Sequence, residues 1–323
     1  MPGLGYCLAA LALYWVFSKF PFAELIVHLR SLDWWWVSLA IVVDTLVYFL
    51  EAWRWKVLLR RVGAPKFWNC LQAVFVGLFV NDILPARTGE VIRCFLLSYK
   101  TEVPISLALT SDFIMRIMDG VWVVVIYLLV TYEIGSHVAV NGVMWVFALI
   151  VLPVAALILL VLFHRQKAHY FVSQEGVGAR FKSLLEQLHR LGDWGDLGLS
   201  MGIGGLYWAF QIMAIWAIAR ADGFYFSGFD MAYLAVVKTV GTVIPNAPAN
   251  VGVFQAAIMR GLEPSLTEPD EAKILAQIIF AFLTLPLILG GAIATLSAGF
   301  NLGELKRRAH AAHAESSATG TAL

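Results

Sequence analysis

Charged residues are scarce in this chain, and their scarcity excludes the ordinary soluble classes of protein. Asp, Glu, Lys and Arg make up 14% of the 323 residues, whereas hydrophobic residues make up 60%. Such a composition cannot cover a water-exposed surface. The formal net charge of +1 gives no basic excess that would attract nucleic acid, so no nucleic-acid partner is expected. We therefore expect a polytopic membrane protein.

Motifs of catalysis and metal binding are also missing. The three cysteines lie in apolar runs without the spacing of a metal site or a disulfide framework. The seven histidines form no H-E-x-x-H motif, and the sequence contains no G-x-x-x-x-G-K-[ST] nucleotide loop. We expect no catalytic residue, no metal, no cofactor and no nucleotide hydrolysis.

Six apolar runs are long enough to be membrane spans. They cover residues 4–17, 35–55, 105–132, 143–163, 199–219 and 274–300. Two further apolar runs, 67–99 and 231–262, are interrupted near their middle by proline and glycine. The predicted fold is all-α and polytopic, with about six transmembrane helices and two re-entrant hairpins that enter from opposite sides.

Basic residues predict the orientation, because cytoplasmic loops carry an excess of Lys and Arg. They gather after the second run, in the loop 165–196 and after residue 305, as Arg54, Lys56, Arg60, Arg61, Lys66, Arg165, Lys167, Arg180, Lys182, Arg190, Lys306, Arg307 and Arg308. We expect both termini in the cytoplasm and the protein in a bacterial inner membrane. Residues 1–304 would form one transmembrane domain with an amphipathic cytoplasmic loop at 165–196, followed by a disordered tail at 305–323.

An internal symmetry follows from this topology. A span, a hairpin and a second span occur within residues 35–132, and the same order recurs upside down within residues 199–300. Inverted repeats with broken helices that meet near the midplane are typical of transporters with alternating access. The two breaks, at Pro85 and Gly89 and at Pro245, Pro248 and Gly252, would correspond.

Ionisable residues inside the membrane are costly and usually mark a pathway or a binding site. The first hairpin contains Asp82, Arg87, Glu90 and Arg93, and the next span carries Asp112, Arg116 and Asp119. The last three recur at i, i+4 and i+7, so they share one helix face, which we expect to point at the first hairpin.

Two interpretations of these charges stay open. Arg87, Arg93 and Arg116 would form a cationic pocket for an anionic lipid head group, most naturally a phosphate, with Glu90 and Asp119 beside them. Alternatively, the charges form a structural network that joins the hairpin to its neighbour. Asp82, Glu90 and Asp112 are candidate proton carriers in either case.

The second hairpin is predicted to contribute shape rather than charge. Asn246 and Asn250 can either bond to a polar head group or cap the following helix. Lys238 is the cation of this hairpin, and it either contacts ligand or extends toward the interface.

Three strings carry a resemblance to a known family: NDILPARTGEVIR from Asn81, DFIMRIMDG from Asp112 and IPNAPANVGVFQ from Ile244. Together they resemble the flippase-like transmembrane family, also called UPF0104, which includes the membrane domain of lysylphosphatidylglycerol synthase. The resemblance implies movement of lipids or lipid-linked precursors between leaflets. The soluble aminoacyl-transferase domain of the synthase is absent, so synthesis of lysyl-lipid is not implied. Gln255 stands where members of the family often carry an acidic residue.

The expected function is thus transport of an anionic lipid through an arginine-lined cavity. The alternatives are a membrane-bound accessory protein or enzyme acting on polyprenyl-phosphate or isoprenoid lipids, and a scaffold of a lipid-modifying complex. The expected partners are membrane lipids, together with a second copy of the chain or an enzyme of lipid biosynthesis.

Overall fold

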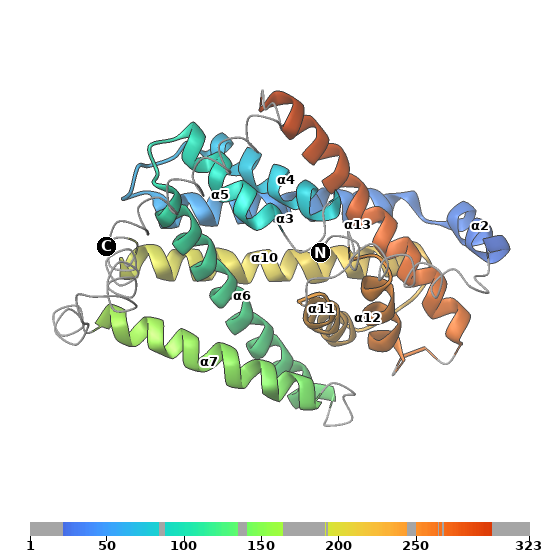
Figure 1. Ribbon diagram of the computed structural model, residues 1–323. Helices are drawn as coiled ribbons and strands as arrows, with labels where there is room; N and C mark the ends of the chain where they lie inside the picture. The colour runs from blue at the N-terminus through green and yellow to red at the C-terminus, as the bar shows by residue number, and fades with distance from the viewer. Residues whose placement is uncertain are drawn as a thin grey trace, which may run out of the picture.

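The computed structural model describes residues 22–83, 88–134, 141–163, 191, 193–243, 250–263, 265–266 and 268–298. All regular structure in these ranges is helical (Figure 1). The helices are α2 (Phe22–Ser31), α3 (Trp34–Leu59), α4 (Phe67–Ile83), α5 (Gly89–Lys100), α6 (Ile105–Ile134), α7 (Asn141–Phe163), α10 (Trp194–Ala221), α11 (Gly228–Thr242), α12 (Val253–Leu262) and α13 (Pro269–Ser297).

Within the described residues, the five helices α3, α6, α7, α10 and α13 are long and apolar enough to cross a membrane. They correspond to five of the six predicted spans, and the chain is an all-α polytopic membrane protein. The remaining predicted span, 4–17, lies outside the described residues, as do residues 165–190 of the predicted cytoplasmic loop and the tail 305–323. The helix α2, which precedes the first described span, was not predicted.

Local sequence sets where the helices begin. Asp33 starts α3, because its side chain accepts a hydrogen bond from the Trp35 N–H at 2.9 Å. Ser227 starts α11 through a capping box with Asp230. Pro269 occupies the first turn of α13, where its missing N–H leaves no hydrogen bond unmade.

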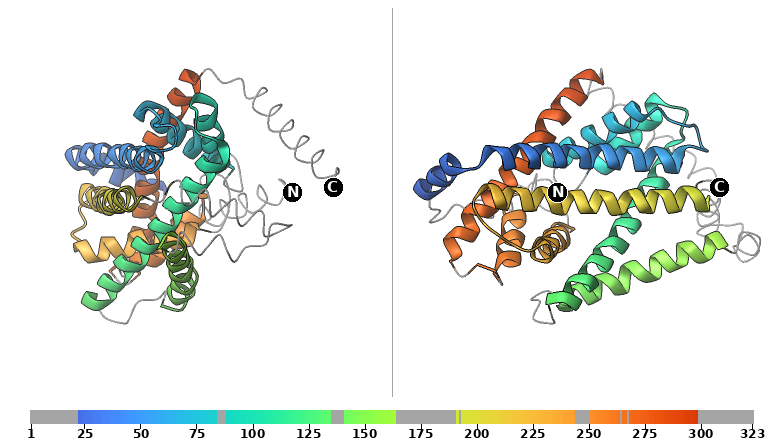
Figure 2. Two further views of the ribbon diagram at one scale, coloured as in Figure 1. Left: turned by 90° about the vertical axis from the view of Figure 1, so that its left-hand side faces the viewer. Right: turned by 180° about the vertical axis from the view of Figure 1, so that it is seen from behind.

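The two long helices α3 and α10 lie side by side and antiparallel (Figure 2). The Asp33 N–H at the start of α3 donates to the Ala221 carbonyl at the end of α10, at 2.9 Å. At the opposite end, Arg61 follows α3, and its Nε lies 3.1 Å from Asp196 Oδ2 in the first turn of α10. The first spans of the two repeats are therefore related by reversal of direction.

The helix contacts have the symmetry expected of inverted repeats. The first hairpin, α4 with α5, packs against α3 and α6 of its own repeat and against α13 of the other. The second hairpin, α11 with α12, packs against α10 and α13 of its own repeat and against α6 of the other. The pattern of contacts stays the same when α3, α4, α5 and α6 are exchanged with α10, α11, α12 and α13. Each hairpin therefore contacts both repeats.

Small residues permit the closest of these approaches. A Cβ on Gly291 of α13 would lie 2.3 Å from Phe79 Cβ of α4. Within the first hairpin, a Cβ on Gly89 would lie 1.8 Å from the Gly77 carbonyl oxygen, so α5 crosses α4 backbone to backbone. The positions of Gly77 and Gly89 therefore admit no larger residue without movement of a helix.

Candidate functional site

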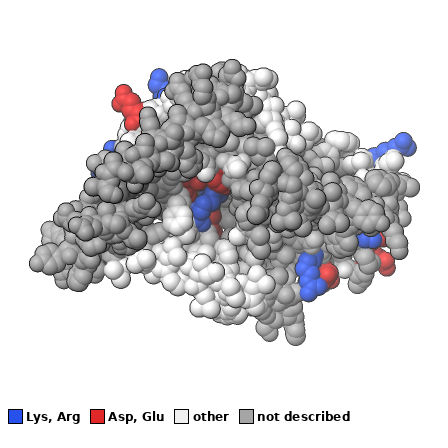
Figure 3. All heavy atoms as spheres, in the orientation of Figure 1, with Lys and Arg blue, Asp and Glu red and all other residues white. Residues whose placement is uncertain are grey.

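Seven ionisable side chains of α3, α5 and α6 form one network, which we call the charged cluster. Its members are Glu51 and Arg54 of α3, Glu90 and Arg93 of α5, and Asp112, Arg116 and Asp119 of α6. Figure 3 shows acidic and basic side chains at the bottom of a hollow in the face seen in Figure 1.

Arg93 is fully enclosed, with 1% of its side chain exposed, and it binds three carboxylates. Its Nη1 lies 2.7 Å from Glu51 Oε1, its Nη2 lies 2.8 Å from Glu90 Oε2, and Nη2 also pairs with Asp112 Oδ1. Its guanidinium carbon lies 5.4 Å from the centre of the Trp55 ring. Arg93 thus joins three helices and is fixed by all of them.

Arg116 is the accessible arginine of the cluster, with 34% of its side chain exposed. Its Nη2 lies 2.8 Å from Glu51 Oε1, and its Nε lies 3.5 Å from Glu90 Oε2. Glu90 is 24% exposed and lies in the first turn of α5, next to the hairpin break. Arg116 and Glu90 therefore form the open side of the cluster.

Arg54 joins α3 to α6 within the cluster. Its Nη1 lies 2.6 Å from Asp119 Oδ1, and its Nη2 donates to the Met115 carbonyl at 3.0 Å. Only 1% of its side chain is exposed, which corrects its assignment to a cytoplasmic flank, because α3 continues to Leu59 instead of ending at Trp55. The sequence contained a signal: Glu51 and Arg54 are three residues apart, so they share a helix face.

The predicted charged face of α6 is present, and it contacts both the first hairpin and α3. Asp112 and Arg116 contact the first hairpin as expected, whereas Asp119 pairs with Arg54 of α3. Arg87 and Pro85 lie outside the described residues. Glu51 and Arg54 are the members that sequence reasoning missed.

The balance of charge in the cluster differs from the predicted cationic pocket. Its described members comprise three arginines and four carboxylates. The buried Nε–H groups of Arg54 and Arg93 nevertheless have no hydrogen-bond acceptor among the described residues, and the Nε of Arg116 has a long contact of 3.5 Å with Glu90 Oε2. Buried donors of this kind normally have partners, so those of Arg54 and Arg93 indicate capacity to bind further oxygen atoms.

The break of the second hairpin is only partly described, because Pro245, Asn246 and Pro248 lie outside the described residues. Asn250 has a φ of 52° and Gly252 a φ of 85°, so the chain turns sharply before α12. Gln255 Oε1 accepts a hydrogen bond from the Gly252 N–H at 2.7 Å. The capping role considered for Asn250 therefore belongs to Gln255.

Lys238 of α11 points into the protein instead of extending toward an interface. Its Nζ donates to Gln211 Oε1 of α10 at 2.9 Å, and the residue is partly buried. Asp82, at the end of α4, is also partly buried, and its Oδ2 has no hydrogen-bond partner among the described residues. Neither residue is a member of the charged cluster in the described contacts.

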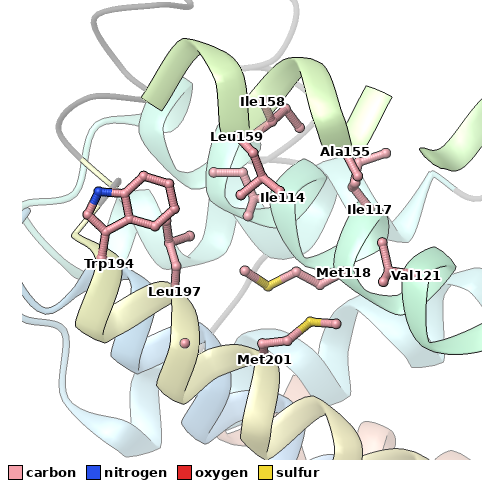
Figure 4. Close-up of a pocket in the computed structure, with 11 residues that line it drawn as sticks. Ile114, Ile117, Met118, Val121, Ala155, Ile158, Leu159, Trp194, Leu197 and Met201 are labelled. Carbon is pink, nitrogen blue, oxygen red and sulfur yellow. The ribbon is translucent and has the colours of Figure 1, made fainter. Parts of the chain in front are cut away.

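An apolar cavity of about 300 Å³ lies between α6, α7 and α10 (Figure 4). It is lined by Ile114, Ile117, Met118, Val121, Ala155, Ile158, Leu159, Trp194, Leu197, Gly198 and Met201. The α6 residues of this lining lie on the side of the helix opposite to Asp112, Arg116 and Asp119. The cavity suits a hydrocarbon chain and is separated from the charged cluster by α6.

Comparison with known proteins agrees with the fold and the motifs. A stretch of 110 residues is 31% identical to the UPF0104 membrane protein MJ1595 of Methanocaldococcus jannaschii, covering 33% of this chain and 32% of that protein. No solved structure matches the chain. The family model described as the lysylphosphatidylglycerol synthase TM region matches residues 4–291. The chain accordingly belongs to the family of the lysylphosphatidylglycerol synthase transmembrane region.

Proposed function

We propose that this protein moves a lipid with an anionic head group between the leaflets of the membrane without hydrolysing nucleotide. The observation that carries the proposal is the charged cluster itself. It brings together three arginines of α3, α5 and α6, two of them with an Nε–H that has no acceptor among the described residues, in a hairpin and spans that pack together. Intramembrane charges in an inverted-repeat fold are typical of a substrate site.

A phosphate is the head group that this site fits best. Guanidinium groups bind phosphate oxygens in pairs, and they do so without losing their own charge. The helix α5 begins at Gly89, immediately before Glu90, so the positive end of its dipole lies at the same break. The head group would occupy the cluster while its tails stay in the bilayer.

Carboxylate exchange is the proposed binding step. The phosphate approaches Arg116 and replaces Glu90 on Arg93 and Arg116, because Glu90 and Arg116 are the exposed members of the cluster. Glu51, Arg54 and Arg93 stay in place as the buried support. The competing Glu90 carboxylate keeps affinity moderate, which a transporter needs in order to release its substrate.

Membrane placement completes the proposal. We assign the protein to a bacterial inner membrane, with the basic end formed by Arg60 and Arg61 after α3 on the cytoplasmic side. Cysteine labelling from either side of intact cells tests this orientation.

Native mass spectrometry of the protein, released gently from its membrane, tests head-group binding. We expect the wild type to retain an anionic lipid and the Arg87→Ala, Arg116→Ala variant to lose it by at least tenfold. The matched control is Arg260→Ala, because Arg260 is 53% exposed on α12 and pairs with the exposed Glu263. Equal lipid retention in all three proteins would contradict the proposal.

Transport itself is tested in vesicles with a fluorescent anionic phospholipid. Purified protein should move the lipid between leaflets without ATP and without a second protein. Movement that requires a partner would instead favour the scaffold, and a chemically altered lipid would favour an enzyme.

A further inference from the structure

A second group of ionisable side chains comes from α3 and from one helix of each hairpin, outside the charged cluster. It contains Asp44 of α3, Asp82 near the end of α4 and Lys238 near the end of α11. Asp44 has 7% of its surface exposed. Sequence reasoning considered Asp82 and Lys238 separately and did not consider Asp44, whereas the fold gathers all three.

Specific contacts hold this group together. The Tyr48 hydroxyl donates to Asp44 Oδ2 at 2.9 Å, and the Lys238 ammonium interacts electrostatically with the Asp44 carboxylate. Tyr48 interacts in the same way with Asp82, whose Oδ2 is buried without a hydrogen-bond partner among the described residues. Tyr48 therefore interacts with both carboxyl groups.

The charge of this group depends on a single proton. With all three side chains ionised, two carboxylates face one ammonium and the group carries a net charge of −1. With one carboxyl protonated, the group is neutral, and a neutral group is much cheaper to keep in a membrane interior. Asp82 reaches the surface in part, so it offers a route by which that proton arrives and leaves.

A proton suits this group better than a metal cation. The Lys238 ammonium would repel a metal ion, and the described residues contain no group of three or more His, Cys, Asp or Glu side chains that could hold one. An adjacent ammonium does not prevent a carboxyl group from taking up a proton.

A chain of contacts connects this group to the charged cluster. Lys238 donates to Gln211, and Gln211 Nε2 lies 2.7 Å from the Tyr207 hydroxyl. The Arg54 guanidinium carbon lies 5.5 Å from the centre of the Tyr207 ring, and Arg54 binds Asp119. A change of charge near Lys238 can thus alter the position of Arg54 through α10.

We propose that Asp44, Asp82 and Lys238 form the proton site that couples lipid movement to a proton gradient. The proposal rests on the proposed transport function and names its coupling ion. Asp44 or Asp82 takes up one proton when the hairpins expose the group to one side of the membrane and loses it on the other side. The groups that interact with Asp44 are Tyr48 of α3 and Lys238 of α11, and Tyr48 interacts in turn with Asp82 of α4 and Tyr207 of α10.

Infrared difference spectroscopy of the purified protein tests proton uptake without any lipid substrate. We expect a carboxylic acid band that appears as the pH falls and is lost or shifted in both Asp44→Asn and Asp82→Asn. Asparagine keeps the size of the side chain and still accepts the Tyr48 hydrogen bond. The control is Asp270→Asn, since Asp270 is 57% exposed and pairs with Lys273 at 2.5 Å. A spectrum that is unchanged by both substitutions would overturn the site.

Lipid movement in vesicles tests the coupling. An imposed pH gradient should accelerate movement by the wild type several-fold, whereas Asp44→Asn should bind lipid normally and ignore the gradient. Wild-type movement that also ignores the gradient would overturn the coupling alone. A wild type that moves no lipid under any gradient would overturn the transport function, and the coupling with it.

Discussion

The two hairpins occupy equivalent positions in the repeats, yet they are built from different chemistry. The first carries Glu90 and Arg93 into the charged cluster, and Asn81 Oδ1 accepts a hydrogen bond from the Gly89 N–H at 2.8 Å to start α5. The second starts α12 in a similar way through Gln255, but it brings Lys238 as its cation. Both hairpins thus have a capped restart, and only the first has a dense set of ion pairs among the described residues.

This difference shows which features of a hairpin the fold needs and which it does not. A capped break and close packing of small residues suffice to form a hairpin, as the second hairpin shows. The ion pairs of the first hairpin are therefore not required by the fold class. Buried ion pairs contribute little net stability once desolvation is counted, so stability alone does not explain this network.

The largest expected effect comes from forcing a side chain between α4 and α5, which cross in direct contact. Gly89→Leu places a side chain against the Gly77 carbonyl oxygen, where a Cβ alone would lie at 1.8 Å. We expect a loss of more than about 3 kcal/mol of stability, because the obstacle is backbone. Thermal unfolding in detergent measures it. Gly198→Ala is the control, since nothing lies within 4 Å of that Cβ position, and equal loss in both variants would contradict the close crossing.

Removing a buried cation should also affect the first hairpin more than the second. Arg93→Met leaves Glu51, Glu90 and Asp112 without their shared partner, so we expect a loss of about 3–5 kcal/mol. Lys238→Met removes the hydrogen bond to Gln211 and the cation beside Asp44, and it should cost less because Asp44 can take up a proton. Chemical or thermal unfolding of the two variants measures both losses of stability. A larger loss in Lys238→Met than in Arg93→Met would contradict the expected difference between the hairpins.

Exchange of arginine for lysine should separate binding from folding in the first hairpin. Arg116→Lys keeps the positive charge but loses the fork that holds two oxygen atoms. We expect anionic lipid retention to fall about tenfold, equivalent to roughly 1.4 kcal/mol, with little change in unfolding temperature because Arg116 is partly exposed. Unchanged retention would indicate that the cluster attracts lipid by charge alone.

Adding a carboxylate to the second hairpin should have the smallest effect on lipid. Gln255→Glu keeps the oxygen that accepts from Gly252, but it faces Gln277 Oε1, which lies 3.5 Å from Gln255 Nε2. We expect a modest loss of stability, about 1 kcal/mol, with lipid retention unchanged. A fall in retention as large as that of Arg116→Ala would show that both hairpins contact the head group.

Much of the architecture could be predicted from the sequence because lipid imposes simple rules. Long apolar runs gave the spans, and Pro and Gly within the runs 67–99 and 231–262 gave the hairpins. The contact of Asp112 and Arg116 with the first hairpin followed from helix periodicity.

The partners of these charges could not be predicted in full. Arg54 was assigned to the flank of a span because basic residues follow it closely, and only the packing of α3 against α6 shows that it is buried. Asp44 is a single carboxylate in an apolar run, and its role depends on Lys238, which is distant in the sequence and close in the fold. Contacts between repeats leave no local pattern.

The packing of the first hairpin against α13 has a consequence for biosynthesis. Glu51, Arg93, Asp112 and Arg116 find one another within the first repeat, so their charges are neutralised soon after α6 enters the membrane. The packing of α4 is completed only after α13, the last described helix to be made, because Gln72 of α4 bonds to the Ala294 carbonyl of α13 at 3.0 Å. Because domains form from the N-terminus during translation, the first repeat would insert with these ion pairs formed but with its packing incomplete, and α13 would complete the packing of both repeats.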